Sequence, residues 1–252
     1  MKKITIIFLA LLFISGLSFS QKKITLSFYG GYTLPVADLK GDFPDTDSNG
    51  INFSKQKTLL TSQGFNGGIQ GKYVVDSSGS ARVTAGLNYN SFSGSADYGS
   101  ISYKNKVSIF TISAGIEYAM NPKNKIVPFG GLDLAANFFS GKVEGSGDTT
   151  FIQNRKTETR FGVIANAGVE LRFWKQSGLI VGVKYALTNL IGKSTSSTTS
   201  STINDAEEEG SSSFNELPLN DKETSSNTDK TLNYVQFYVG FSFNFGGLIG
   251  TK

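Results

Sequence analysis

The sequence predicts an all-β protein, an eight-stranded antiparallel up-and-down transmembrane β-barrel. Three observations lead to this prediction. Residues 232–245 alternate between apolar and polar side chains, seven other stretches share this pattern, and the connections between the stretches alternate between short and long. A period of two residues is typical of strands with one apolar and one polar face, whereas helices repeat every three or four residues.

The alternation is clearest in residues 232–245. Its apolar face consists of every second residue: Val235, Phe237, Val239, Phe241, Phe243 and Phe245. The residues between them are mostly polar, and successive side chains of a strand point to opposite faces. The stretch is long enough to cross a bilayer as a tilted strand, which takes about ten residues. Taken alone, it fits a half-buried strand of a soluble protein equally well.

Seven more strands are predicted from the same pattern, at residues 24–33, 64–75, 81–91, 107–119, 126–139, 158–173 and 179–190. The phase of 126–139 is ambiguous, because Phe129 and Phe139 fall on its polar side. Leu132 and Leu134 define the apolar side of this strand.

The connections after successive strands are long, short, medium, short, medium, short and very long. Alternate connections of an up-and-down barrel lie at the same end, so every short turn lies at one end and every long loop at the other. Outer-membrane barrels show this asymmetry, with short periplasmic turns and long external loops. The sequence therefore predicts external loops at about 34–63 and 192–231.

Composition permits this fold and excludes several kinds of chemistry. Hydrophobic residues make up 38% of the 252 residues, which suits a barrel because only alternate side chains face lipid. The chain has no Cys and no His, so disulfides and catalytic or metal sites built on these residues are excluded. The net charge of +4 is too weak and scattered to indicate nucleic acid as a partner.

Residues 1–20 are predicted to be a secretory signal peptide. Lys2 and Lys3 precede an apolar run at 4–14, and the small residues Ser18 and Ser20 precede a cut before Gln21. A membrane anchor is the alternative, although the run is short and no Cys follows for lipid attachment. The predicted barrel domain is residues 21–252.

The polar faces carry charges that a barrel would enclose. An eight-stranded barrel is just wide enough for its own side chains to fill it, and buried charges need partners. We therefore expect a plugged lumen, with an interior charge network of Lys72, Arg82, Glu117, Asp133, Arg160, Glu170, Arg172 and Lys184. A narrow pore for small solutes is the alternative. Eight interior charges of mixed sign are more simply explained as a packing network than as a catalytic pair. We therefore expect that the protein is not an enzyme and has no catalytic residues and no cofactor.

Aromatic residues near the strand ends are expected to form two girdles at the membrane interfaces. They are Tyr32, Tyr73, Tyr89, Tyr118, Phe173, Trp174, Tyr185 and Phe245. In a soluble ligand-binding barrel, the competing interpretation, the apolar face and these aromatics would instead point inward.

One loop contains a weak cation motif. Asp45, Asp47 and Asn49 match the first half of a calcium loop, D-x-D-x-N-G. Gln56 stands where the bidentate Glu is expected, so a polar external turn is the better interpretation and no metal site is predicted. The acidic, Ser/Thr-rich loop at 192–231 offers little to bury and could contact a surface ligand.

Three segments resemble the small eight-stranded outer-membrane barrels of the OmpA transmembrane domain and OmpX type. They are the predicted signal ending at 19–21, residues 127–134 (VPFGGLDL) and residues 241–245 (FSFNF). The resemblance covers about 22–245 and looks closest to outer membrane protein beta-barrel domain proteins. It implies a monomer among outer-membrane lipid and lipopolysaccharide, inserted by the barrel-assembly machinery. Phe241, Phe243 and Phe245 then match the assembly signal, although seven residues follow Phe245.

Overall fold

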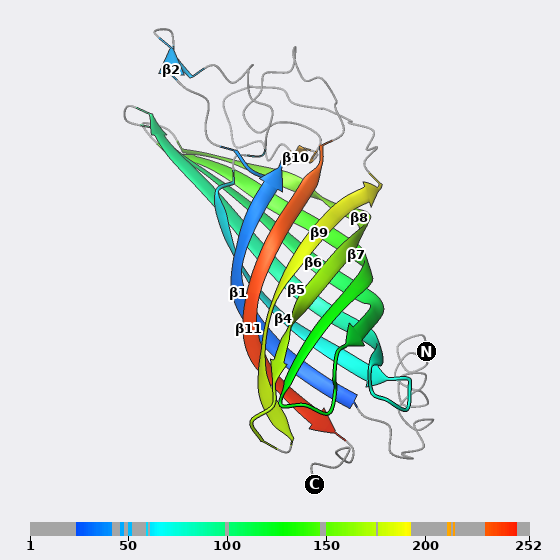
Figure 1. The fold of residues 1–252 in the computed structure, drawn as a ribbon. Helices are drawn as coiled ribbons and strands as arrows, with labels where there is room; N and C mark the ends of the chain where they lie inside the picture. Colours follow the sequence, from blue (N-terminus) through cyan, green and yellow to red (C-terminus); the bar gives the residue numbers. More distant parts are fainter. Residues whose placement is uncertain are drawn as a thin grey trace, which may run out of the picture.

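The protein is described by a computed structural model that covers residues 24–41, 46–47, 50–51, 59, 61–98, 101–146, 150–174, 176–192, 211–212, 214 and 230–245. Eight long antiparallel strands form a closed barrel (Figure 1). The predicted fold class is therefore confirmed. The predicted signal peptide at 1–20 lies outside the described residues. Of those described, none belongs to a helix long and apolar enough to cross a membrane.

The long strands are β1 (Ile24–Ala37), β4 (Gln63–Val74), β5 (Ala81–Tyr98), β6 (Ile101–Ala119), β7 (Ile126–Ser146), β8 (Thr150–Leu171), β9 (Ser177–Ile191) and β11 (Leu232–Phe245). Two-residue strands β2 (Thr46–Asp47) and β3 (Gly50–Ile51) pair with each other. A third short strand, β10 (Ser211–Ser212), pairs in parallel with Asn154 and Arg155 of β8.

The barrel closes where the first long strand meets the last. β1 pairs with β4 on one side and β11 on the other, and β9 pairs with both β8 and β11. Around the ring the order is β1-β4-β5-β6-β7-β8-β9-β11. Ile24 pairs with both Tyr73 and Phe245, so the start of β1 lies at the same end as the close of β11.

The apolar faces point outward and the polar faces point into the lumen. Strand β7, whose phase was ambiguous in the sequence, shows this most clearly. Leu134 is 72% exposed, while Phe129 on the same strand is 4% exposed. Phe139 is buried as well. Leu132 and Leu134 thus mark the outer face as predicted, and two aromatic rings are enclosed with the polar residues.

Several strands extend beyond the predicted limits at the long-loop end. β5 continues to Tyr98 and β6 begins at Ile101, so most of the predicted 92–106 connection is strand. β7 and β8 similarly include most of 140–157, and β1 runs to Ala37 inside the predicted 34–63 loop. Most of these extensions lack the apolar outer face of the predicted strands, which removes the alternation used for prediction while leaving backbone pairing intact. Beyond Ser93, β5 pairs only with β6, and Figure 1 shows this hairpin projecting past the barrel mouth.

The opposite end has short connections with defined turn chemistry. Asp76, between β4 and β5, accepts hydrogen bonds from the Ser78 hydroxyl and from the backbone N–H of Ala81. Both hydrogen bonds lower the pKa of the Asp76 carboxyl, and the bond from Ser78 has the larger effect. Gly79 (φ 83°) and Asn121 (φ 50°) take the left-handed conformation that two of these turns require.

Candidate functional site in the barrel lumen

An ion cluster of Lys72, Arg82, Glu117 and Glu170 lies in the lumen near the short-turn end. Lys72 Nζ is 2.9 Å from Glu117 Oε2 and 2.8 Å from Glu170 Oε1. Arg82 Nη1 is 3.0 Å from Glu117 Oε1 and 2.7 Å from Glu170 Oε1. All four side chains are buried, and two cations face two carboxylates. Buried charges of this kind are tolerated because each has hydrogen-bonded partners of opposite sign.

The ion cluster joins opposite walls of the barrel. Lys72 is on β4 and Glu170 is on β8, which are four places apart in the eight-strand ring. The Lys72 ammonium also lies 4.0 Å above the centre of the Phe129 ring, a cation–π contact. Arg172, which is partly exposed, adds a third cation at 3.0 Å from Glu170 Oε2.

Lys184 and Asp133 lie beside the ion cluster and hydrogen-bond to neutral groups. Lys184 Nζ donates a 2.7 Å hydrogen bond to the Tyr29 hydroxyl and lies over the rings of Tyr29 and Tyr238. Asp133 Oδ1 accepts a 2.5 Å hydrogen bond from the Thr84 hydroxyl. Tyr29 and Tyr238 are in contact, with ring centroids 4.9 Å apart.

Amide and hydroxyl side chains form a network further along the lumen. Asn88 donates to Gln236 at 2.8 Å, and Gln236 donates in turn to Asn66 at 2.9 Å. Asn90 donates to the Tyr234 hydroxyl at 3.0 Å, linking β5 to β11. These two strands are three places apart in the ring, so the network also spans the lumen.

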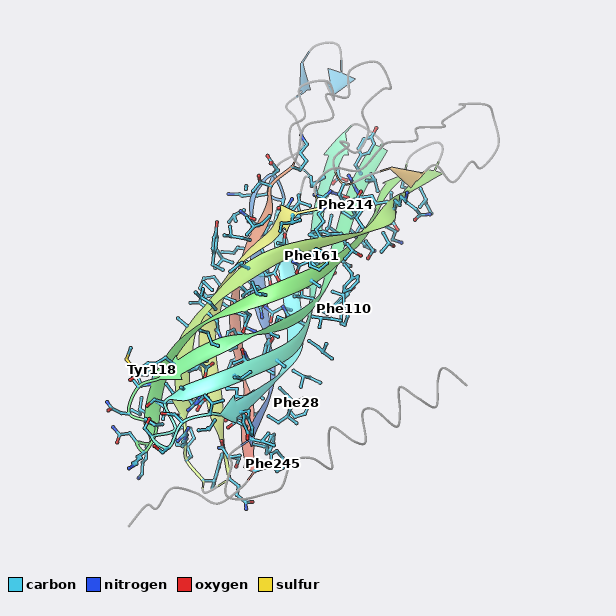
Figure 2. The ribbon with its side chains drawn as sticks, turned by 90° about the vertical axis from the view of Figure 1, so that its right-hand side faces the viewer. Phe28, Phe110, Tyr118, Phe161, Phe214 and Phe245 are labelled. Atoms are coloured by element: carbon cyan, nitrogen blue, oxygen red, sulfur yellow. The ribbon has the colours of Figure 1, made fainter. Side chains whose placement is uncertain are left out.

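Apolar side chains gather at the long-loop end of the lumen. Phe92, Ile109, Phe139 and Tyr234 come from the barrel wall, and Phe214 comes from the stretch between β9 and β11. Leu39 and Leu59, from the connection between β1 and β4, belong to the same buried cluster. The Phe139 and Phe214 rings are 5.5 Å apart, and Figure 2 places Phe214 near the upper end of the barrel.

Arg160 belongs to this outer region and not to the ion cluster. Its guanidinium lies 2.5 Å from Glu158 Oε2 and over the Phe139 ring. Glu158 Oε1 also accepts a 3.0 Å hydrogen bond from the backbone N–H of Phe214. Arg155 lies over the Phe214 ring, 5.2 Å from its centre.

Hydrogen bonds attach the loop residues to the strands. The backbone N–H of Leu59 donates to the carbonyl of Asp38 at 2.7 Å, and Asn105 on β6 donates to the Leu59 carbonyl. Asp38 Oδ2 accepts a 2.6 Å hydrogen bond from the backbone N–H of Thr231. The two connections that flank β1 and β11 are therefore tied together at the mouth.

The eight residues predicted as an interior network fall into three groups. Lys72, Arg82, Glu117, Glu170 and Arg172 come together. Asp133 and Lys184 are separate, and Arg160 is at the far end of the lumen. Sequence reasoning missed Arg155, which lies in a stretch expected to be a connection, and Glu158, the first residue of the predicted strand at 158–173. It also missed Phe214. For Phe214 the only available signal was a single aromatic residue in a Ser-rich stretch.

The outer surface carries the apolar and aromatic side chains. Phe28, Phe110 and Phe161 project outward from the wall in Figure 2, and each is exposed. Of the eight predicted girdle residues, Tyr73 is half-buried and the other seven are exposed. The exposed seven are Tyr32, Tyr89, Tyr118, Phe173, Trp174, Tyr185 and Phe245. The alternative of a soluble barrel with its apolar face inward is therefore wrong.

The residues of the weak cation motif fall largely beyond the described part of the chain. Asp45 and Asn49 lie outside it, and Asp47 is described only as part of the β2–β3 pair. Within the residues that the structure does describe, no group of three or more acidic, Cys or His side chains could hold a metal ion.

A closed barrel with an apolar outer belt and an enclosed polar interior defines the class of integral outer-membrane β-barrel proteins. The family model of the outer membrane protein beta-barrel domain matches residues 6–245, and the chain belongs to this family. It is accordingly a protein of the bacterial outer membrane. A search of curated proteins found no match.

Solved structures of outer-membrane proteins are similar over most of the chain. Neisserial surface protein A (NspA) is 14% identical, with a TM-score of 0.44, over 90% of this chain and 98% of NspA. OprG from Pseudomonas aeruginosa is 11% identical, with a TM-score of 0.46, over 89% of this chain and 96% of OprG. Ail of Yersinia pestis, in complex with the heparin analogue sucrose octasulfate, is 9% identical, with a TM-score of 0.40, over 89% of this chain and 97% of Ail.

Proposed function

We propose that this chain is a non-enzymatic outer-membrane barrel with a plugged lumen, which acts through its extracellular loops. The observation that carries the proposal is the 2.8 Å contact between Lys72 Nζ and Glu170 Oε1, on opposite strands of the ring. A water-filled passage between these strands would need that contact to open. Breaking a buried ion pair costs several kcal/mol, about 3–5 when one partner is removed.

Two further layers support the plug. The Asn88–Gln236–Asn66 chain crosses the lumen beyond the ion cluster. The apolar residues around Phe214 and Phe139 lie beyond that chain, at the outer mouth. A hydrated ion would have to pass charged, amide and apolar layers in sequence.

Conductance in planar lipid bilayers tests the plug. The purified full chain, first shown to be folded by a gel-mobility shift between unboiled and boiled samples, is expected to give no resolved current steps. A sixteen-stranded porin inserted in the same bilayers is the positive control. Reproducible steps from the folded protein would favour the alternative, a narrow pore for small solutes.

The state of the carboxylates supports the non-enzymatic part of the proposal. Glu117 and Glu170 are both bound by Lys72 and Arg82, so neither is available as a general acid or base. Incubation of the folded protein with lipopolysaccharide is expected to give no hydrolysis or acyl transfer. Product formation that follows the purified protein would refute this part.

The exposed end of β11 supports a role in assembly. Phe241, Phe243 and Phe245 all point outward, and the Phe243 ring is 6.3 Å from that of Phe28 on β1. We propose that these three residues are the signal for the barrel-assembly machinery. Phe245→Ala should lower the folded amount in outer membranes several-fold, while Phe237→Ala, on the same face of β11, should not. Equal amounts of the two variants would count against the signal.

A further inference from the structure

The outer face of the extended β6–β7 pair carries a lysine cluster made of Lys104, Lys106 and Lys142, with Glu144 among them. Lys142 Nζ is 2.5 Å from Glu144 Oε1, and Lys106 Nζ is 4.0 Å from Glu144 Oε2. Lys104 is directly opposite Glu144 in the strand register. The side chains of Lys106 and Lys142 remain 42% and 41% exposed, so their ammonium groups are accessible from outside the barrel.

The charge of the lysine cluster is not balanced. Lys106 and Lys142 are paired directly across the strands, an arrangement that is unfavourable for like charges. Glu144 supplies one negative charge for three positive ones, which leaves a net charge of +2. An external anion that contacts both lysines would relieve this repulsion.

The lysine cluster lies next to the apolar outer surface of the barrel, and this position indicates what kind of anion it would meet. Phe110 and Phe138 lie on the outer face, with ring centroids 6.1 Å apart. Ser108 follows, and its hydroxyl accepts a 2.9 Å hydrogen bond from Tyr89. Lys106 comes next on the same face, about 13 Å along the strand from Phe110 at about 3.3 Å per residue. The order apolar, hydroxyl, cationic is that of a membrane interface, and Figure 2 shows Phe110 projecting outward below the upper end of the barrel.

We propose that the lysine cluster binds the phosphate groups of a phosphorylated lipid headgroup in the outer leaflet. Ammonium groups form short, charge-assisted hydrogen bonds with phosphate oxygens, and cations at a membrane surface attract anionic headgroups. The lipid chains of the same molecule would lie along Phe110 and Phe138. The proposal rests on the outer-membrane position of the barrel and is independent of whether the lumen is plugged.

Native mass spectrometry of the full chain in detergent, titrated with bisphosphorylated lipid A, tests the site. Lys106→Gln/Lys142→Gln is expected to weaken binding by about 10- to 30-fold, at about three- to fivefold for each lysine. Lys123→Gln/Lys125→Gln, which removes two exposed lysines from the short-turn end, is the matched control and should bind as the wild type does. Glu144→Gln removes the competing internal anion and should tighten binding.

Two further experiments distinguish a lipid phosphate from free inorganic phosphate as the ligand. Lipid A stripped of its phosphates, with the same acyl chains, should lose the lysine-dependent part of the binding. Inorganic phosphate at the lipid concentration should not displace the phosphorylated lipid. Equal binding by the Lys106/Lys142 variant and the wild type, or by lipid with and without phosphate, would overturn the proposal. Displacement by equimolar inorganic phosphate would overturn the assignment to a lipid. The bilayer conductance result decides the plug separately.

Discussion

The backbone N–H of Phe214 and the carboxylate of Glu158 are joined by a 3.0 Å hydrogen bond, although 56 residues separate them in the chain. The same carboxylate holds the fully buried guanidinium of Arg160 at 2.5 Å. Glu158 thus connects a loop residue at the outer mouth to a charge on the barrel wall.

Replacing Glu158 should destabilise the protein. Glu158→Ala leaves the buried Arg160 without this carboxylate and is expected to lower the free energy of unfolding by about 3 kcal/mol. Urea titration of the protein refolded in lipid vesicles measures the change. Thr159→Ala is the control, because Thr159 is exposed on the outer face of the same strand. A cost no greater than that of the control would show that the pair contributes little.

Glu170 is the carboxylate that contacts most cations in the ion cluster, namely Lys72, Arg82 and Arg172. Glu170→Leu should cost about 3–5 kcal/mol, because it leaves buried positive charges facing one another. Lys72→Met in addition should cost much less than the sum of the two single changes, since the pair is then removed together. Additive costs in this double-mutant cycle would mean that Lys72 and Glu170 are not coupled.

Two adjacent glycines of β4 provide a matched test of the strand faces. A Cβ on Gly68 would lie 2.6 Å from the Tyr29 ring and hydroxyl and 2.8 Å from the Leu87 carbonyl oxygen, whereas a Cβ on Gly67 would have 3.9 Å of clearance. Gly68→Ala should therefore destabilise the barrel by about 1–3 kcal/mol, as overpacking does. Gly67→Ala should change stability by less than about 0.5 kcal/mol, as at a surface position. Equal effects in urea titration would contradict the assignment of faces.

The most exposed residue of the apolar belt on β7 reports on the bilayer. Leu134 is 72% exposed and lies near the middle of its strand. Leu134→Arg should cost about 2–4 kcal/mol in lipid vesicles, the cost of an arginine at the bilayer midplane. Thr157→Arg, on the exposed outer extension of β8, should cost no more than about 1 kcal/mol. A small cost at Leu134 would place that residue outside the hydrocarbon layer.

Alternation alone was enough to predict the eight strands and to divide each one into two faces, with Leu134 and Asp133 on opposite sides, because the strand period is two whatever the tertiary structure. The loop asymmetry and the charged polar faces were needed to assign the polar side to the lumen. Depth along the barrel could not be predicted in this way. Whether Lys72 of β4 meets Glu170 of β8 or Asp133 of β7 depends on the stagger of the strands around the ring, which barrel closure determines.

The strand ends and the loop contacts were also beyond prediction. Lys104 and Lys142 lie where the outer face of the sheet is polar, so no apolar outer face marks their stretches as strand. Phe214 is buried among side chains from distant strands, and its local sequence contains no pattern that specifies such a contact. Both depend on tertiary structure, which overrides local preference.

The pairing of Ile24 with Phe245 has a consequence for the order of folding. The strand that completes the ring is the last of the long strands to be synthesised, so β1 keeps an open hydrogen-bonding edge until β11 reaches it. Joining segments this far apart carries a large loop-closure entropy and makes folding slow. An unpaired edge is also a template for aggregation during that delay. The β1 edge is therefore the part of the barrel that stays open to wrong pairing for longest, until β11 covers it.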